Sequence, residues 1–352
     1  TGFYKELREN IDQYFKNQNK SKTGGKEIIF KISFLLIVYV LAYISIFYFT
    51  DMTYIYIVYS FLGGWSILLG LNIGHDAAHN TIFKKKKYNK YLLLVFELLG
   101  TSSYNWVNRH IGAHHLFPNV MDLDSDIQQT NMVKIFPNDK HLKIHALQHL
   151  YMPFLYMFYI LRWIVYRDFK DASTSNIGVF DNSKFPRKEL FKMIASKAFY
   201  LFYMVVIPSY VLNVSIVSFL LAFLILTFSG SLVITFVLLS THVGEDANFP
   251  KANEKGILPH SWSYHQLITT SDFSTDNKTI NFLFGGFNHH VIHHLFPNIC
   301  HVHYPELTKI LKSVAIKHDA PYSSEKYLIM AIYSHFKLLK KNSYNLTQVD
   351  HA

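Results

Sequence analysis

The stretch AFYLFYMVVIPSYVLNVSIVSFLLAFLILTFSGSLVITFVLLST, Ala198–Thr241, decides the fold of this chain, because its 44 residues include no Asp, Glu, Lys or Arg. A helix rises ~1.5 Å per residue and a hydrocarbon core is about 30 Å thick, so roughly 20 apolar residues cross it once. The stretch is therefore long enough for two crossings, with a break expected between Pro208 and Asn213. The sequence predicts a helical hairpin that spans a membrane twice.

A second hairpin is predicted nearer the N-terminus. Ile32–Thr50 and Met52–Gly74 are both free of charged residues, and only a short turn at Asp51 separates them. The expected fold is therefore all-α: a polytopic membrane protein with four spans in two hairpins and a cytoplasmic helical cap. The predicted spans cover residues 32–50, 52–74, 194–212 and 214–240.

The composition agrees with a membrane protein. Half of the residues are hydrophobic and 16% are charged, against roughly 25% charged in an ordinary soluble protein. The net charge of +10 comes from Lys and Arg that flank the apolar spans, a pattern that favours an anionic membrane face over a nucleic-acid partner. The single Cys300 excludes a disulfide within the chain.

The distribution of Lys and Arg predicts the orientation. The hairpin tips near Asp51 and Asn213 contain neither residue, whereas the segments on the opposite side carry many, including the run Lys84–Lys87. Cytoplasmic loops are enriched in Lys and Arg. We therefore expect a multi-pass protein whose two termini and active site face the cytoplasm.

Histidines carry the strongest functional signal. The chain has 20, and eight of them form three clusters that the predicted topology places on one side of the membrane. Residues at i and i+4 share one face of an α-helix, so the spacing within the clusters brings imidazoles together. The clusters are His75 and His79; His110, His114 and His115; and His290, His293 and His294.

Eight clustered imidazoles indicate two metal ions. A structural zinc site takes four protein ligands and a catalytic one takes three, so one ion leaves too many histidines unused. Imidazole ligands suit Zn, Cu, Fe and Ni alike, and the residue types alone leave the metal open.

The clusters resemble the three histidine boxes of the membrane fatty acid desaturases. HDAAH, HIGAHH and HHVIHH match the patterns HxxxH, HxxxHH and (H/Q)xxHH, and HHLFPNICHVHYPEL, His293–Leu307, is similar to acyl-CoA or acyl-lipid front-end desaturases. The likeness runs from the first span to about Leu307. It departs from many front-end members at His290, where they carry Gln.

The resemblance implies a reaction and its cofactors. It implies a di-iron centre that uses O2 to desaturate a fatty acyl chain carried by CoA, a carrier protein or a lipid, with membrane lipid around the spans. The sequence contains no His-Pro-Gly-Gly haem motif, so the resemblance implies that electrons arrive from a separate ferredoxin or cytochrome b5. It also implies a catalytic domain at residues 30–308, between cytoplasmic segments at 1–29 and 309–352.

The resemblance adds one ligand to the boxes, His242, which follows the fourth span. The implied metal ligands are His75, His79, His110, His114, His115, His242, His290, His293 and His294. Behind the second box, one or two of Asp122, Asp124 and Asp126 are expected to accept the free N–H of a ligating imidazole; the alternative is a solvated acidic loop.

Two other functions remain open at this point. A hydroxylase, epoxidase or acetylenase would use the same boxes, because the geometry of oxygen transfer separates these reactions. A metal-binding protein or transporter without enzymatic activity would place histidines along a path inside the spans, whereas the boxes here gather at one end of them.

Overall fold

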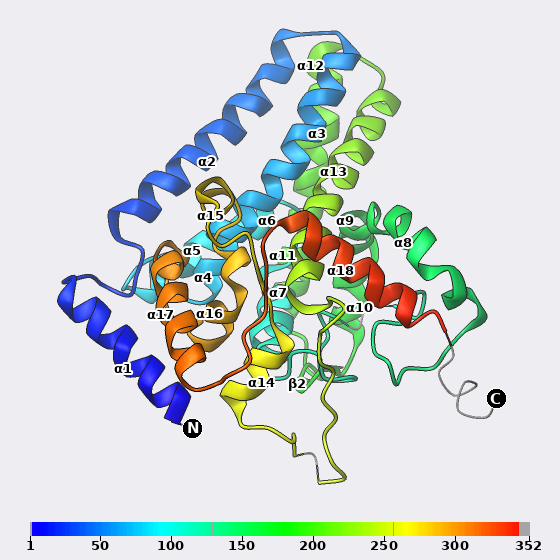
Figure 1. Ribbon diagram of the computed structural model, residues 1–352. Helices are drawn as coiled ribbons and strands as arrows, with labels where there is room; N and C mark the ends of the chain where they lie inside the picture. The colour runs from blue at the N-terminus through cyan, green and yellow to red at the C-terminus, as the bar shows by residue number, and fades with distance from the viewer. Residues whose placement is uncertain (1, 128–129, 256, 345–352) are drawn as a thin grey trace. The chain divides into compact units, whose positions relative to one another are not determined.

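The computed structural model describes residues 2–127, 130–255 and 257–344, and the chain divides into two compact units. Unit 1 comprises Thr1–Lys22, Arg109–Phe154 and Phe236–Ala352, and unit 2 comprises Thr23–Asn108 and Leu155–Thr235. The end of the predicted C-terminal segment, 345–352, lies outside the described residues. The described chain is mostly helical with two short strand pairs (Figure 1), as the sequence predicts.

Among the described residues, four helical segments are long and apolar enough to cross a membrane, in agreement with the predicted fold class of four candidate spans. The helices extend past the predicted cores because a charge-free window marks only the hydrocarbon-buried part, while Lys at a helix end reaches the interface. The segments are Gly25–Tyr48 (α2, Gly25–Ser45, and η1, Ile46–Tyr48), Met52–Ala78 (α3, Met52–Leu69, η2, Gly70–Gly74, and α4, His75–Ala78), Arg187–Leu212 (α11, Arg187–Leu201, η6, Phe202–Val206, and α12, Ile207–Leu212) and Ile216–His242 (α13).

Short polar signals close both hairpins of unit 2. Asp51 precedes α3, and its side chain accepts a hydrogen bond from the Thr53 amide at 2.7 Å, which caps the helix. Asn213 ends α12 in the left-handed region at a φ of 53°, a conformation that Asn tolerates. The break predicted between Pro208 and Asn213 therefore falls at Asn213, and Figure 1 shows both turns at the same end of unit 2.

Small residues let α3 and α13 pack closely. A Cβ at Gly230 would lie 2.8 Å from the Gly63 carbonyl oxygen, and the Ser229 hydroxyl donates to the Ser60 carbonyl at 2.7 Å. Such residues allow close helix packing in membranes, where lipid removes the hydrophobic drive between helices. The outward residues of α2 are apolar, with Leu41 60% exposed, as expected of a surface that faces lipid.

Shorter elements complete unit 2. They connect the two hairpins and include a two-stranded antiparallel pair. They are α5 (Lys86–Leu92), α6 (Leu94–Leu98), α7 (Ser103–Arg109), α9 (Tyr159–Arg162), η5 (Trp163–Arg167), α10 (Asp168–Ser173), β1 (Asn176–Ile177) and β2 (Phe180–Asp181).

Unit 1 is built on a pair of amphipathic helices, α1 (Gly2–Asn17) and α17 (Tyr304–Lys317). Apolar residues of α1 recur every fourth position, including Leu7 and Ile11, and pack into one core with Leu307 and Leu311 of α17. The same core contains Val291 and Ile292, so it anchors the helix that carries the third histidine box. The other elements are η3 (His110–His114), η4 (Lys143–Leu147), α8 (Gln148–Tyr156), α14 (Trp262–Thr269), β3 (Asp272–Phe273), α15 (Lys278–Leu283), η7 (Phe287–His289), α16 (His290–Leu295), η8 (His301–His303), β4 (Ser324–Glu325) and α18 (Leu328–Lys341).

Candidate metal centre

Seven of the predicted ligands lie in unit 1, and all seven side chains are buried. They come from three places in the sequence: η3 and the residue after it, the last residue of α13, and α16. They are His110, His114, His115, His242, His290, His293 and His294. Their imidazoles form two groups, which are defined by the contacts between their Nε2 atoms.

The four-histidine group consists of His114, His242, His290 and His294, and their ligand atoms all lie within 4.8 Å of one another. The Nε2 of His242 is 3.1 Å from that of His114 and 2.8 Å from that of His290. The Nε2 atoms of His290 and His294 are 3.2 Å apart. Four ring nitrogens from three segments therefore converge on one point.

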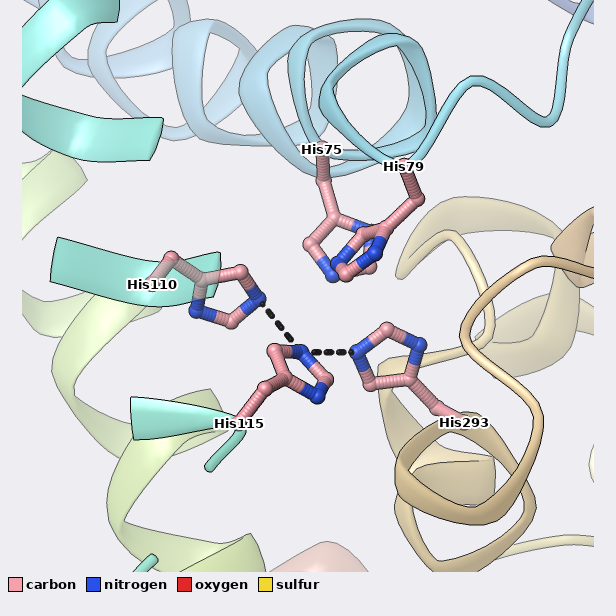
Figure 2. A group of neighbouring side chains, drawn as sticks. All are labelled: His75, His79, His110, His115 and His293. Atoms are coloured by element: carbon pink, nitrogen blue, oxygen red, sulfur yellow. Dashed lines mark hydrogen bonds between the residues drawn. The ribbon is translucent and has the colours of Figure 1, made fainter. Parts of the chain in front are cut away.

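The three-histidine group consists of His110, His115 and His293 (Figure 2). The Nε2 of His115 is 3.1 Å from that of His110 and 3.0 Å from that of His293. Residues His110–His114 form a π-helix, and the His115 amide donates to the His110 carbonyl. This i, i+5 geometry pairs His110 with His115 and directs His114 into the other group, a division that i, i+4 spacing does not predict.

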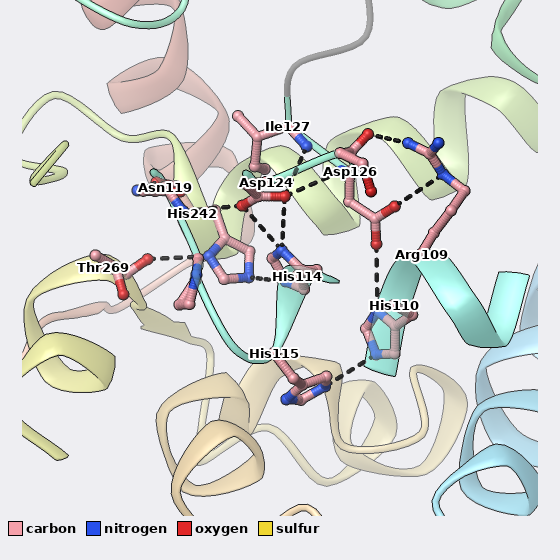
Figure 3. A network of polar contacts seen from close by, with 12 residues as sticks. Arg109, His110, His114, His115, Asn119, Asp124, Asp126, Ile127, His242 and Thr269 are labelled. Carbon is pink, nitrogen blue, oxygen red and sulfur yellow. Dashed lines mark hydrogen bonds and ion pairs between the residues drawn. The ribbon is translucent and has the colours of Figure 1, made fainter. Parts of the chain in front are cut away.

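The ring nitrogens of His242 and His114 that point away from the four-histidine group have acceptors. His242 Nδ1 donates to the Thr269 carbonyl at 2.9 Å, and His114 Nδ1 contacts the Asp124 carboxylate at 3.0 Å (Figure 3). With the proton on Nδ1, each Nε2 presents a lone pair, and lone pairs 3.1 Å apart repel unless a positive charge lies between them. One proton bridges only two nitrogens, whereas a metal ion can bind all four.

The spacing fits a metal ion. Two nitrogen ligands about 2.1 Å from one ion and at right angles to each other lie about 3.0 Å apart, close to the separations in both groups. Burial and the neighbouring imidazoles hold the pKa of His294 well below its ordinary value. His294 is therefore neutral near pH 7, the form in which imidazole binds a metal.

Asp124 is the main support of the second box. Its fully buried carboxylate accepts hydrogen bonds from the amides of Asn119, Asp126 and Ile127, at 2.8, 3.0 and 3.2 Å, as well as contacting His114 (Figure 3). Burial would lower the pKa of His114, but this carboxylate outweighs burial and raises it. Asn119 also donates to the His242 carbonyl at 2.8 Å, so one loop holds two of the predicted ligands.

Other partners orient the remaining imidazoles. Asp126 lies 3.4 Å from His110 Nδ1 and forms an ion pair with Arg109, whereas Asp122 is exposed. Two of the three aspartates named from the sequence thus face histidines of the second box, and the third is exposed in the same loop. Carboxylates and other acceptors at this position fix the tautomer and orientation of a metal-binding imidazole.

Two supports were not identified from the sequence. His294 Nδ1 lies 2.8 Å from Gln266 Oε1, and His293 Nδ1 lies 3.1 Å from the Tyr304 hydroxyl. Gln266 is 28 residues from its histidine, and no spacing rule connects them. Tyr304 lies in the stretch that carries the family resemblance, which was the only available signal.

His75 and His79 belong to unit 2. They lie at the end of the second span, in and after α4, and their ring centroids are 4.8 Å apart (Figure 2). The His75 ring makes an edge contact with Trp106, and Phe96 stacks on Trp106. A Cβ at Gly74 would lie 2.5 Å from the Phe96 ring, so glycine permits the packing that positions the first box.

Four candidate membrane spans and two buried groups of converging imidazoles define a multi-pass membrane protein with a histidine-rich site suited to two metal ions. The family model for fatty acid desaturases matches residues 52–326. The chain therefore belongs to the fatty acid desaturase family and is an oxidoreductase, as the three boxes predict.

Named relatives extend along nearly the whole chain. An acyl-lipid (8-3)-desaturase of Physcomitrium patens is 29% identical over 96% of this chain and 71% of that protein. An sn-1 linoleoyl-lipid 6-desaturase of Synechocystis is 29% identical over 96% of this chain and 95% of that protein. A probable Delta(5) fatty acid desaturase C of Dictyostelium discoideum is 28% identical over 96% of this chain and 75% of that protein.

Proposed function

We propose that this desaturase introduces a double bond into a lipid-linked fatty acyl chain, using O2, two iron ions and electrons from a separate ferredoxin or cytochrome b5. The convergence of seven buried Nε2-bearing rings in unit 1 carries the proposal, because such an arrangement is unfavourable without cations. Oxidation of a C–H bond by O2 at a metal centre requires a metal that changes its oxidation state. Zinc does not, and iron accepts imidazole ligands.

The proposed ligands of the two ions follow from the two groups. One ion is held by His114, His242, His290 and His294. The other is held by His110, His115 and His293 together with the first box, His75 and His79. The assignment of the first box rests on the family pattern HxxxH and on the need of a three-histidine group for further ligands.

When bound, the ions supply the oxidising power that breaks unactivated C–H bonds, which acid–base side chains cannot do. The protein's own residues orient and protect the centre. Thr269, Gln266 and Tyr304 contact Nδ1 atoms and keep the imidazoles directed inward. Burial of the imidazoles excludes bulk water, which protects reactive species from side reactions.

The acyl carrier proposed is a lipid rather than CoA or a carrier protein. The relatives from Physcomitrium and Synechocystis are named as lipid-linked desaturases, and the third box resembles front-end enzymes. Such enzymes insert a bond between an existing double bond and the carboxyl group, so the proposed substrate is already unsaturated.

The proposed topology places both termini and the histidine boxes in the cytoplasm, with 30–308 as the catalytic domain between segments 1–29 and 309–352. It rests on the hairpin tips near Asp51 and Asn213, which lack Lys and Arg. Labelling Asn213→Cys with an impermeant thiol reagent, in a Cys300→Ser background, tests it. Reagent applied from outside the cell should label this cysteine. If only reagent on the cytoplasmic side labels it, the orientation is the reverse of the proposed one.

The fatty acid profile of a host that expresses the chain tests the reaction. Gas chromatography with mass spectrometry should show a new acyl product lighter by two hydrogens, recovered in the lipid fraction. A His294→Ala control, expressed at the same level, should give none. A product heavier by one oxygen, lost in the same control, would replace desaturation with hydroxylation or epoxidation.

A further inference from the structure

A small pocket adjoins the four-histidine group within unit 1. Its walls come from the end of α13, the end of α14, β4 and α18. Asp246 and Ser323 line the pocket and are exposed, whereas His242 and Thr269 line it and are buried. The pocket therefore leads from the surface to the contact between a proposed metal ligand and the carbonyl that orients it.

Half of the lining residues carry a hydroxyl group. The Ser240 and Thr241 hydroxyls donate to helix carbonyls at 2.6 and 2.8 Å, which leaves their oxygen lone pairs available to accept hydrogen bonds. The carboxylates of Asp246 and Glu325 also line the pocket. The hydroxyl-bearing residues are Ser240, Thr241, Thr269, Thr270, Ser271, Ser323 and Ser334.

The size of the pocket limits which molecules can occupy it. Its volume is about 40 Å³, and one water molecule needs roughly 10–15 Å³ on this scale. About three water molecules fit, with hydroxyl and carboxylate partners on several sides. An acyl chain or a lipid headgroup is too large for this volume.

The proposed reaction requires protons at a buried place. Desaturation converts O2, two electrons, two protons and –CH2–CH2– into –CH=CH– and two molecules of water. Two C–H bonds break, one C=C bond forms, and O2 is reduced to water by two electrons from the redox carrier and two from the substrate. The protons come from solvent, and the imidazoles of the four-histidine group are at most 3% exposed.

We infer that this pocket is the inlet through which water and protons reach the metal centre. The inference rests on the proposed function. Asp246 and Glu325 take up protons at the mouth, and water molecules held by the hydroxyls carry them inward. His242 belongs to both the pocket and the four-histidine group, so the path ends at the edge of the centre.

Filling the pocket tests whether it carries water. Ala331 lines it, is 2% exposed and has no polar group in its side chain. In the iron-loaded enzyme, Ala331→Leu should slow amide hydrogen exchange in the segment Ile268–Asp272 by at least about tenfold. Ile332→Leu, at the next position of α18 and outside the lining, is the matched control and should leave exchange unchanged.

Kinetics test whether the water carries protons. Ala331→Leu should lower kcat about tenfold with KM unchanged, since a proton relay contributes at least that much. The solvent deuterium isotope effect on kcat should rise, and more of the O2 consumed should appear as hydrogen peroxide. Glu325→Gln keeps the shape of the pocket and should shift the same three quantities in the same direction, even if the leucine variant folds poorly.

Unchanged isotope effects and unchanged coupling of O2 to product in both variants would overturn the inference, even with slower exchange in the leucine variant. Failure of the proposed function would look different. The unmodified enzyme would then give no desaturated product, although amide hydrogens around its pocket would still exchange with solvent.

Discussion

The two units each bury a polar cluster, and the clusters differ in one respect. In unit 2, the buried Asp168 carboxylate faces Lys197 Nζ at 2.7 Å, the Ser102 amide at 3.0 Å and Asn105 Nδ2 at 3.2 Å. The carboxylate oxygens of Asp168 face hydrogen-bond donors, and the charge of Lys197 balances that of Asp168. In the four-histidine group of unit 1, acceptor nitrogens meet one another.

The difference separates a structural cluster from a binding site. Buried polar groups are normally paired, and the cluster of unit 2 follows that rule with groups of its own. His242 and His114 have partners at Nδ1, on the outside, while their Nε2 atoms lie 3.1 Å apart. Substitutions in the Asp168 cluster should therefore change stability, and those in the four-histidine group should change metal content.

The largest effect is expected for His242→Ala. This residue contacts both His114 and His290 through Nε2, so its removal opens the four-histidine group. Desaturated product should fall to background, and about one equivalent of iron per chain should be lost. Metal analysis of the purified variant checks this, and full retention of iron would show that His242 is not a ligand.

Lys197→Met should destabilise the fold without touching the metal. Removing one partner of a buried ion pair leaves an uncompensated charge, at a cost of about 3–5 kcal/mol. Thermal denaturation in detergent should show a lower midpoint, with the iron content of the folded protein unchanged. Adding Asp168→Asn should recover part of the loss, because the unpaired charge is then removed.

Asp124→Asn should weaken metal binding while the protein stays folded. The amide oxygen still accepts from His114 Nδ1, but the negative charge that makes this imidazole a stronger ligand is lost. Loss of such a partner costs about 10–100-fold in metal affinity, which chelator competition measures. Asp122→Asn, in the exposed part of the same loop, is the control and should leave the affinity unchanged.

The smallest effect is expected for His289→Gln, although His289 is next to a proposed ligand. Its Nδ1 and Nε2 contact Thr308 Oγ1 at 2.9 Å and Asn281 Oδ1 at 3.0 Å, so both nitrogens are used within the fold. Losing one such hydrogen bond costs about 1 kcal/mol. The thermal midpoint should fall slightly while iron content stays the same; a loss of iron would place His289 among the ligands.

The spans and boxes were predictable because their signals are local. A charge-free stretch such as Ala198–Thr241 indicates a lipid environment, and histidines clustered at i, i+4 can be recognised in a single sequence. Residue spacing predicted His290, His293 and His294 as one cluster, and His289 was not among the predicted ligands. The structure places His290 in the four-histidine group and turns His289 toward Thr308.

The supports of the site were less accessible. Asp124 lies ten residues from His114 and could be named as a candidate, whereas Gln266 meets His294 only through the tertiary fold. The division of His110 and His114 between two groups depends on a π-helix, which the residue spacing does not reveal. Sequence patterns therefore predicted which histidines lie close together better than how they are divided between the two groups.

Metal analysis of the purified protein tests the central claim, that the histidines hold two iron ions, most directly. Elemental analysis after expression in iron-supplemented medium should find about two irons per chain, since imidazole sites can also take other metals when iron is scarce. The double variant His75→Ala/His79→Ala should keep about one, bound by the four-histidine group. One zinc per chain, with no activity restored by added iron, would contradict the account.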